Sequence, residues 1–270
     1  MKLKYFGWSS FGLESKNGTL YFDPFYRKAF DFSWSTIEDY YDAKVVCVTH
    51  GHADHLIDVP EVIKTTDALC IAGSDITKHY KNKYNVSENR LIALNDFETI
   101  TIAGFKITAF EWGHKEMKVS ALKIINLIKT LIFNGVFFKM TKYMLMNNRE
   151  ALFSAIPMGF HVETPDGIKV LNYCEGFNDD TDFKRLEELG KKFDTDILLA
   201  GASFDWDDYV ARGAAAFSPK TVLLFTPHEP DRYWGLPYTP NEVFIDKVKR
   251  SLPNADVIWA DPGFNKVFTN

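Results

Sequence analysis

The chain has 270 residues, of which 46% are hydrophobic and 15% aromatic, and its formal net charge is −5 at pH 7. This composition supplies enough apolar residues for a large core, and the acidic balance argues against nucleic acid as the main partner. The three cysteines are widely spaced, so a disulfide framework is not expected. The N-terminus lacks the features of a signal peptide, and no apolar run is long enough for a transmembrane span. We therefore expect a cytoplasmic protein.

Strand-like and helix-like patterns alternate along most of the chain. Residues 3–15 and 18–25 predict a β-meander, because polar and apolar residues alternate on both sides of a short turn. A helix is expected over residues 58–66, with Asp58 as N-cap and Pro60 in the first turn. Other helices are expected over 74–84, 180–193, 210–217 and 239–253. Other strands are expected at 43–50, 68–73, 90–96, 97–104, 105–114, 155–164, 168–176, 195–201, 220–230 and 255–263.

Residues 115–150 interrupt this alternation. The segment is helical in pattern and strongly apolar, and its basic residues include Lys118, Lys123, Lys129, Lys139 and Lys142. We expect a helical insertion within a single domain that spans residues 1–270. It could pack on the core or on another subunit of a homo-oligomer. Alternatively, it forms a lid or an interfacial surface for a lipid-like substrate and for peripheral membrane contact.

Residues that can bind metals follow several of the predicted strands. Residues 43–57 read AKVVCVTHGHADHLI, which places three histidines and an aspartate directly after a buried strand. Strand ends at one edge of a sheet converge in space, and zinc favours imidazole nitrogens and carboxylate oxygens. The sequence therefore predicts a metal site, and the candidate ligands are His50, His52, Asp54, His55, His114, Glu175 and His228.

The pattern His-x-His-x-Asp-His over residues 50–55 resembles the signature of the metallo-β-lactamase superfamily. The later order of a lone histidine, an acidic residue after a strand and a final histidine is also similar, as are the hairpin before Asp23-Pro24 and the segment 253–263. The resemblance covers most of the chain except residues 27–43 and 115–150. It lies nearest to the stand-alone hydrolases that include lactonases and N-acyl phosphatidylethanolamine phospholipase D. It implies an α+β fold, a four-layer αββα sandwich with metals at one edge of the sheets.

The resemblance also implies which residues hold which ion. His50, His52 and His114 would hold the first metal, and Asp54, His55 and His228 would hold the second. Glu175 stands where the family usually has a bridging aspartate, within Cys174-Glu175-Gly176 instead of Gly-Asp-Thr. The longer side chain could bridge both ions or bind only one, and Asp179, Asp180, Asp182 or Cys174 could replace it. Two divalent ions are expected, with zinc preferred and manganese or iron as alternatives.

The expected function is that of a metal-dependent hydrolase. A metal-bound hydroxide would attack an ester, lactone or phosphodiester in a small-molecule or lipid-like substrate, and Asp54 would be the catalytic residue that orients this nucleophile. The sequence has no Gly-x-Ser-x-Gly motif that would favour a serine nucleophile. Two alternatives remain: a mononuclear iron oxidoreductase of the same fold, or a non-catalytic metal-bound binding protein. Asp23 is interpreted as a support for the ligands, and His161 as an ordinary strand residue.

Overall fold

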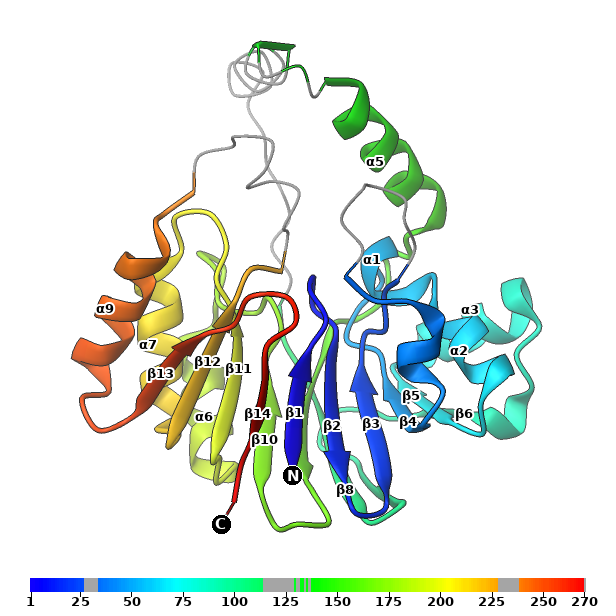
Figure 1. Cartoon of the computed structure of the whole chain (residues 1–270), viewed down its shortest axis with the longest axis horizontal. Coiled ribbons are helices and arrows are strands. Elements are labelled where there is room, and N and C mark those ends of the chain that lie inside the picture. Colours follow the sequence, from blue (N-terminus) through cyan, green and yellow to red (C-terminus); the bar gives the residue numbers. More distant parts are fainter. Residues whose placement is uncertain are drawn as a thin grey trace.

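The computed structural model describes residues 1–26, 34–113, 129, 132, 133, 135, 137–227 and 238–269. Over these residues the chain forms two seven-stranded sheets that pack face to face, with helices on both outer faces (Figure 1). This arrangement confirms the predicted four-layer αββα sandwich.

The first sheet contains the strand that leads into the histidine motif. Its order is β14 (Asn265–Val267), β1 (Lys2–Tyr5), β2 (Phe11–Ser15), β3 (Gly18–Phe22), β4 (Ala43–Cys47), β5 (Leu69–Ala72) and β6 (Leu91–Ala93). The strands β1, β2 and β3 form the predicted antiparallel meander, whereas β3 to β6 are parallel. Gly18 ends the β2–β3 turn with φ of 120°, a conformation that glycine adopts at low cost.

The second sheet contains the strand that leads into Glu175. Its order is β13 (Asp256–Trp259), β12 (Thr221–Phe225), β11 (Ile197–Gly201), β10 (Lys169–Asn172), β9 (Met158–Glu163), β8 (Phe105–Glu111) and β7 (Thr99–Ile102). The strands β10 to β13 are parallel, so β10, β11 and β12 all end at the same edge of the sheet. The strands β7, β8 and β9 continue the sheet in antiparallel pairs.

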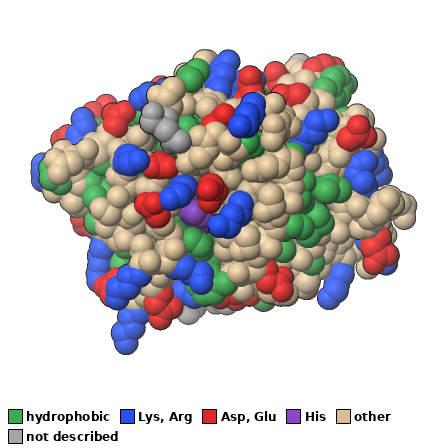
Figure 2. All heavy atoms as spheres, turned by 90° about the horizontal axis from the view of Figure 1, so that it is seen from below, with side chains coloured by type: hydrophobic (Ala, Val, Ile, Leu, Met, Phe, Trp, Pro, Cys, Tyr) green, Lys and Arg blue, Asp and Glu red, His purple; other side chains and the backbone are tan. Residues whose placement is uncertain are grey.

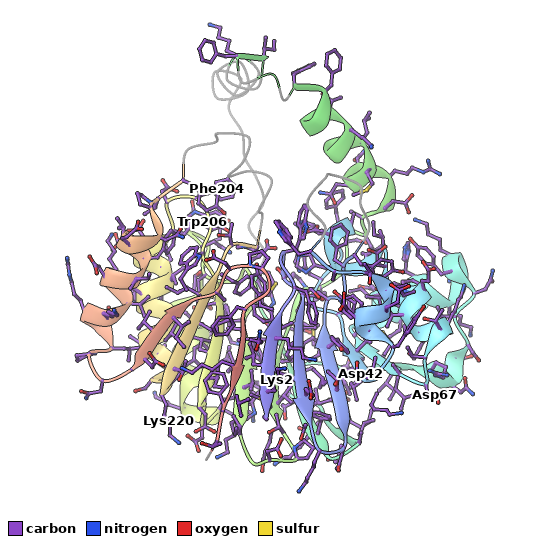
Figure 3. The ribbon with its side chains drawn as sticks, in the orientation of Figure 1. Lys2, Asp42, Asp67, Phe204, Trp206 and Lys220 are labelled. Atoms are coloured by element: carbon purple, nitrogen blue, oxygen red, sulfur yellow. The ribbon has the colours of Figure 1, made fainter. Side chains whose placement is uncertain are left out.

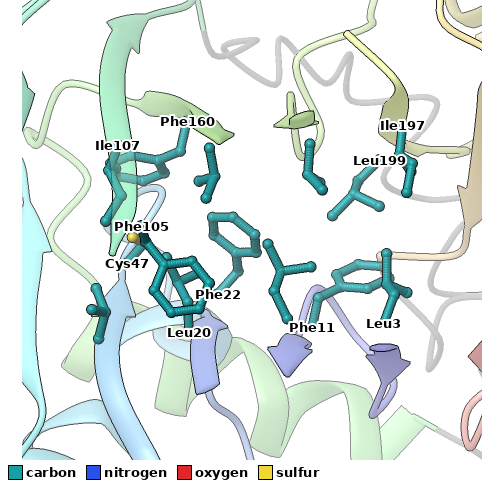
Figure 4. Close-up of a cluster of buried hydrophobic side chains, with 14 of the residues drawn as sticks. Leu3, Phe11, Leu20, Phe22, Cys47, Phe105, Ile107, Phe160, Ile197 and Leu199 are labelled. Atoms are coloured by element: carbon teal, nitrogen blue, oxygen red, sulfur yellow. The ribbon is translucent and has the colours of Figure 1, made fainter. Parts of the chain in front are cut away.

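The main core lies between the two sheets (Figure 4). Alternate residues of each strand point inward, as the period of two requires. The first sheet contributes large side chains such as Phe11 and Phe22, and the second contributes Phe105 and Phe160, all of them fully buried. Because both sheets are held by this shared layer, their edges keep a fixed position relative to each other.

Helices cover the outer faces of both sheets. Near the first sheet lie η1 (Ile37–Tyr40), α1 (Ala53–Leu56), α2 (Val59–Thr65), α3 (Ser74–Tyr84) and η2 (Glu88–Arg90). The second sheet is covered by α6 (Phe183–Lys192), α7 (Asp207–Phe217) and α9 (Asn241–Ser251). The helix α5 (Phe137–Glu150) lies at the end of the sandwich that carries α1 (Figure 1).

Several details differ from the sequence-based expectation. The short strand β14 was not expected, because three residues are too few to show a strand period; it pairs with β1 and brings the two chain ends together. The helix expected from residue 210 begins three residues earlier, at Asp207. Asp58 is the N-cap of α2, but its carboxylate accepts a hydrogen bond from the Tyr26 N–H instead of capping the helix. Within the segment 115–150, residues 137–150 form the helix α5, whereas residues 115–128 lie outside the described part of the chain.

Candidate metal centre

The histidine motif begins where β4 ends. The backbone continues the sheet for one more residue, since the Val48 N–H donates to the Ile71 oxygen at 2.9 Å. The chain then turns through His50 and His52 into α1, which contains Asp54 and His55. Apart from the exposed Lys44, strand β4 is apolar and buried, so it fixes the start of this turn at the carboxyl edge of the parallel strands, where open sheets place their ligands.

His55 joins the motif to acidic residues of both sheets. Its Nδ1 lies 2.9 Å from Asp23 Oδ2, and its Nε2 lies 3.1 Å from Glu175 Oε1 and 3.4 Å from Asp54 Oδ2. Burial by itself lowers the pKa of His55, but the neighbouring carboxylates of Asp54 and Asp23 raise it, and the net pKa lies well above its ordinary value. The carboxylates of Asp23, Asp54 and Glu175 therefore concentrate negative charge around this ring, which favours a positively charged group or ion.

Thr49 and Asp23 support the motif from behind. The Asp23 carboxylate accepts hydrogen bonds from the Thr49 N–H at 2.8 Å and from the Thr49 hydroxyl at 2.7 Å. The same hydroxyl lies 3.1 Å from His50 Nδ1. Asp23 has φ of 43° in the left-handed region, a strained conformation for a residue other than glycine. The interpretation of Asp23 as a support agrees with these contacts, whereas nothing in the sequence marked Thr49.

The potential ligand atoms gather into three overlapping groups. Within each group they lie within 4.8 Å of one another, and the groups are His50, His52 and Glu175; Asp54, His55 and Glu175; and His50, His55 and Cys174. Glu175 is common to the first two groups. Imidazole nitrogens and carboxylate oxygens that are buried together suit a divalent ion such as zinc, so the residues present fit a metal.

Five of the seven predicted ligands thus come together in the structure. His114 and His228 lie outside the described residues. Among the acids considered as replacements for Glu175, Asp182 caps α6 instead, since its carboxylate accepts from the N–H groups of Lys184 and Arg185. Cys174 is buried beside the site. Its φ of 52° places its backbone in the left-handed region, as is also the case for Asp23.

Aromatic rings surround the histidines. The Trp112 ring, just after β8, lies 5.7 Å from the His50 ring between centroids, and the Phe153 ring lies 5.7 Å from that of His52. Phe204 and Trp206 also lie at the α1 end of the sandwich, opposite to Lys2 and Lys220 (Figure 3). Nothing in the local sequence marks Trp112 and Phe153 as neighbours of the histidines, because both lie far from the motif along the chain.

The segment around the end of α5 holds the motif in place. Asn147 Oδ1 accepts from the Ala53 N–H at 3.1 Å, and the Leu152 N–H donates to the Gly51 oxygen at 2.6 Å. The Met158 N–H, at the start of β9, donates to the Thr49 oxygen at 2.7 Å. The motif is therefore bound on one side to Asp23 and on the other to Asn147 of α5 and to residues that follow this helix.

Comparisons with known proteins show which family and which fold this chain resembles. Residues 2–131 match a family model described as a β-lactamase superfamily domain. A UPF0173 metal-dependent hydrolase of Salinibacter ruber is 26% identical over 200 residues, which cover 74% of this chain and 71% of the relative. The structure of Igni18, a metallo hydrolase from the archaeon Ignicoccus hospitalis, covers 99% of both chains with a TM-score of 0.67 and 19% identity. An isothiocyanate hydrolase from Delia radicum gut bacteria shares the fold, with a TM-score of 0.66 and 13% identity.

The comparisons define the fold and a partial family match. The chain has the metallo-β-lactamase fold, and its residues 2–131 are similar to the β-lactamase superfamily domain. Among curated proteins it is similar to the UPF0173 metal-dependent hydrolases.

Proposed function

We propose that this protein is a metal-dependent hydrolase with a binuclear site, preferably for zinc, that cleaves an ester, lactone or phosphodiester. His50, His52 and Glu175 would contribute to one ion, and Asp54, His55 and Glu175 to the other, with His114 and His228 completing the two sets. The observation that carries this proposal is the position of Glu175, whose carboxylate is shared by both groups of potential ligand atoms.

The residues of the site suit hydrolysis in several ways. Bound divalent ions supply Lewis-acid chemistry, because they make water more acidic and polarise a substrate oxygen. The buried Asp54 carboxylate can accept a hydrogen bond from the attacking water and orient it. Asp23 holds His55 through Nδ1, which leaves Nε2 directed at Glu175 and Asp54. The exposed ring of Phe153 beside His52 offers an apolar contact to the substrate.

The narrower placement beside the lactonases and N-acyl phosphatidylethanolamine phospholipase D is part of the same proposal. The aromatic surroundings of the histidines support a substrate with an apolar portion. A panel of a simple ester, a lactone with a long acyl chain and an aromatic phosphodiester would separate the three reaction classes.

Metal content tests the proposal directly. Elemental analysis of protein purified without added metal is expected to give two divalent ions per chain in the wild type. Glu175→Ala should retain about one, because it removes the shared ligand. Glu187→Ala is the matched control, since it removes an exposed carboxylate from the neighbouring helix α6; it should retain two.

Two other kinds of result would favour one of the alternative functions. A single iron per chain that is unaffected by Glu175→Ala would contradict the bridging role and favour the oxidoreductase alternative. Protein that binds no metal, or that binds two ions and cleaves none of the three substrate classes, would favour a binding protein.

A further inference from the structure

The helix α5 exposes large apolar side chains next to basic ones. Phe138 and Leu145 are 84% and 66% exposed, and the preceding Phe133 is 92% exposed. Lys142 is also exposed, and the side chain of Arg149 is 85% accessible, although its Nε lies 3.3 Å from Glu150. Single exposed apolar residues are common, but several of them gathered on one surface mark a place where another molecule binds.

These residues share one side of the helix. Phe138, Lys142, Leu145 and Arg149 follow one another at intervals of four, three and four residues, which is the spacing of a single helical face. We call these four residues the outer face of α5. It alternates apolar and basic groups and contains no acidic residue, although the whole chain is acidic.

Residues beside and behind the outer face attach α5 to the body of the protein. Met146 packs against the apolar cluster beneath α2 and α3, and Asn147 accepts from the Ala53 N–H in the metal motif. Glu150 pairs with Lys83 of α3 at 2.8 Å. These contacts orient the helix, so the outer face is exposed because of how α5 is anchored.

The face at the end of the molecule opposite to α5 has a different mixture of side chains. Viewed from the end opposite to α5, basic and acidic side chains lie interspersed, with scattered apolar groups between them (Figure 2). None of the described helices combines the length and the apolar composition needed to cross a bilayer. Because the outer face of α5 combines apolar and basic side chains, it suits contact with a surface that is apolar inside and negatively charged outside.

We propose that the outer face of α5 docks the protein onto an anionic lipid surface. Phe138 and Leu145 would enter the boundary between headgroups and acyl chains, while Lys142 and Arg149 would contact the phosphates. Since Asn147 of the same helix contacts the metal motif, docking would bring the candidate metal centre to the lipid surface. This inference concerns where the protein binds and does not require the proposed hydrolysis.

Vesicle flotation with the full chain tests the docking. The wild type is expected to float with equimolar phosphatidylcholine and phosphatidylglycerol vesicles at low salt, and to bind pure phosphatidylcholine at least about tenfold more weakly. Lys142→Gln with Arg149→Gln should remove this preference for anionic lipid. Phe138→Ser with Leu145→Ser should weaken binding to both kinds of vesicle, because it removes the apolar contact.

Matched controls use exposed residues elsewhere. Lys106→Gln with Lys220→Gln removes the same charge from other surfaces, and Val243→Ser with Val267→Ser removes exposed apolar groups; both should bind like the wild type. Thermal unfolding and metal content should confirm that each variant folds. Failure of the wild type to bind anionic vesicles would overturn the proposal, as would equal binding by all variants. A dimer in solution that Phe138→Ser with Leu145→Ser dissociates, without vesicle binding, would show that a second copy occupies this face.

Discussion

His55 shows how neighbouring groups define one residue of the site. Its two ring nitrogens face carboxylates on opposite sides, Asp23 on one and Glu175 with Asp54 on the other. An imidazole held in this way keeps one nitrogen for support and the other for a ligand. Asp23 is therefore a positioning residue, because it acts on the site through His55 and Thr49.

Replacing Asp23 by asparagine should weaken metal binding. The change keeps the shape of the side chain but removes the charge that orients His55, and losses of about 10–100-fold in metal affinity follow such changes. Competition with a chromogenic chelator measures the affinity. Asp42→Asn is the control, since Asp42 also accepts two side-chain hydrogen bonds, from Thr19 and Tyr21, but lies away from the motif. Equal affinity in the two variants would contradict the positioning role.

At the scale of elements, the connection from α5 to β9 constrains the metal motif. The Leu152 N–H donates to the Gly51 oxygen, and a Cβ placed on Gly51 would lie 2.0 Å from the Leu152 oxygen. Only a residue without a side chain permits this approach of two backbones. The glycine between His50 and His52 is thus required by a segment about a hundred residues further along the chain.

Gly51→Ala should therefore destabilise the protein and loosen the motif. The added methyl group meets rigid backbone, and overpacking of this kind costs about 1–3 kcal/mol. The melting temperature and the metal content should both be lower than in the wild type. Gly113→Ala serves as the comparison, because within the described part of the chain, apart from its own neighbours, no atom lies within 4 Å of the methyl group it adds. If both variants melted at the same temperature, the close approach of Gly51 and Leu152 would make no contribution to stability.

At the scale of the whole molecule, the candidate metal centre lies where the two sheets meet. Asp23 and the histidine motif follow strands of the first sheet, whereas Glu175 follows β10 of the second. An ion held by residues from both sheets would stabilise their association, because it binds the folded chain and not the unfolded one. Without it, carboxylates from both sheets remain close together in a buried place.

Removal of metal should consequently lower the melting temperature. At a metal concentration of about a hundred times Kd, binding contributes roughly 2.7 kcal/mol to stability, which corresponds to roughly 5–10 °C for a chain of this size. Calorimetry with and without a chelator measures the shift. His52→Ala is the control, and its melting temperature should respond less to the chelator. An identical melting temperature of the wild type in both conditions would show that no stabilising ion is bound.

Much of the fold could be predicted from local patterns. Helix α3 was expected at its exact limits, and the meander β1 to β3 follows from strict alternation around a short turn. The strand β14 was missed because its three residues carry no periodic signal. The early start of α7 was missed because Asp207 and Asp208 are polar and do not continue the apolar pattern.

The sequence by itself determined the metal-binding chemistry of this protein, because four of its potential ligands lie within six residues and their types and spacing are local properties. Only the tertiary structure decided that Glu175 meets His55, that Thr49 joins Asp23 to His50, and that α5 turns its basic and apolar face outward. These contacts join segments far apart along the chain. They depend on how two sheets and a helix pack, which no short stretch of sequence specifies.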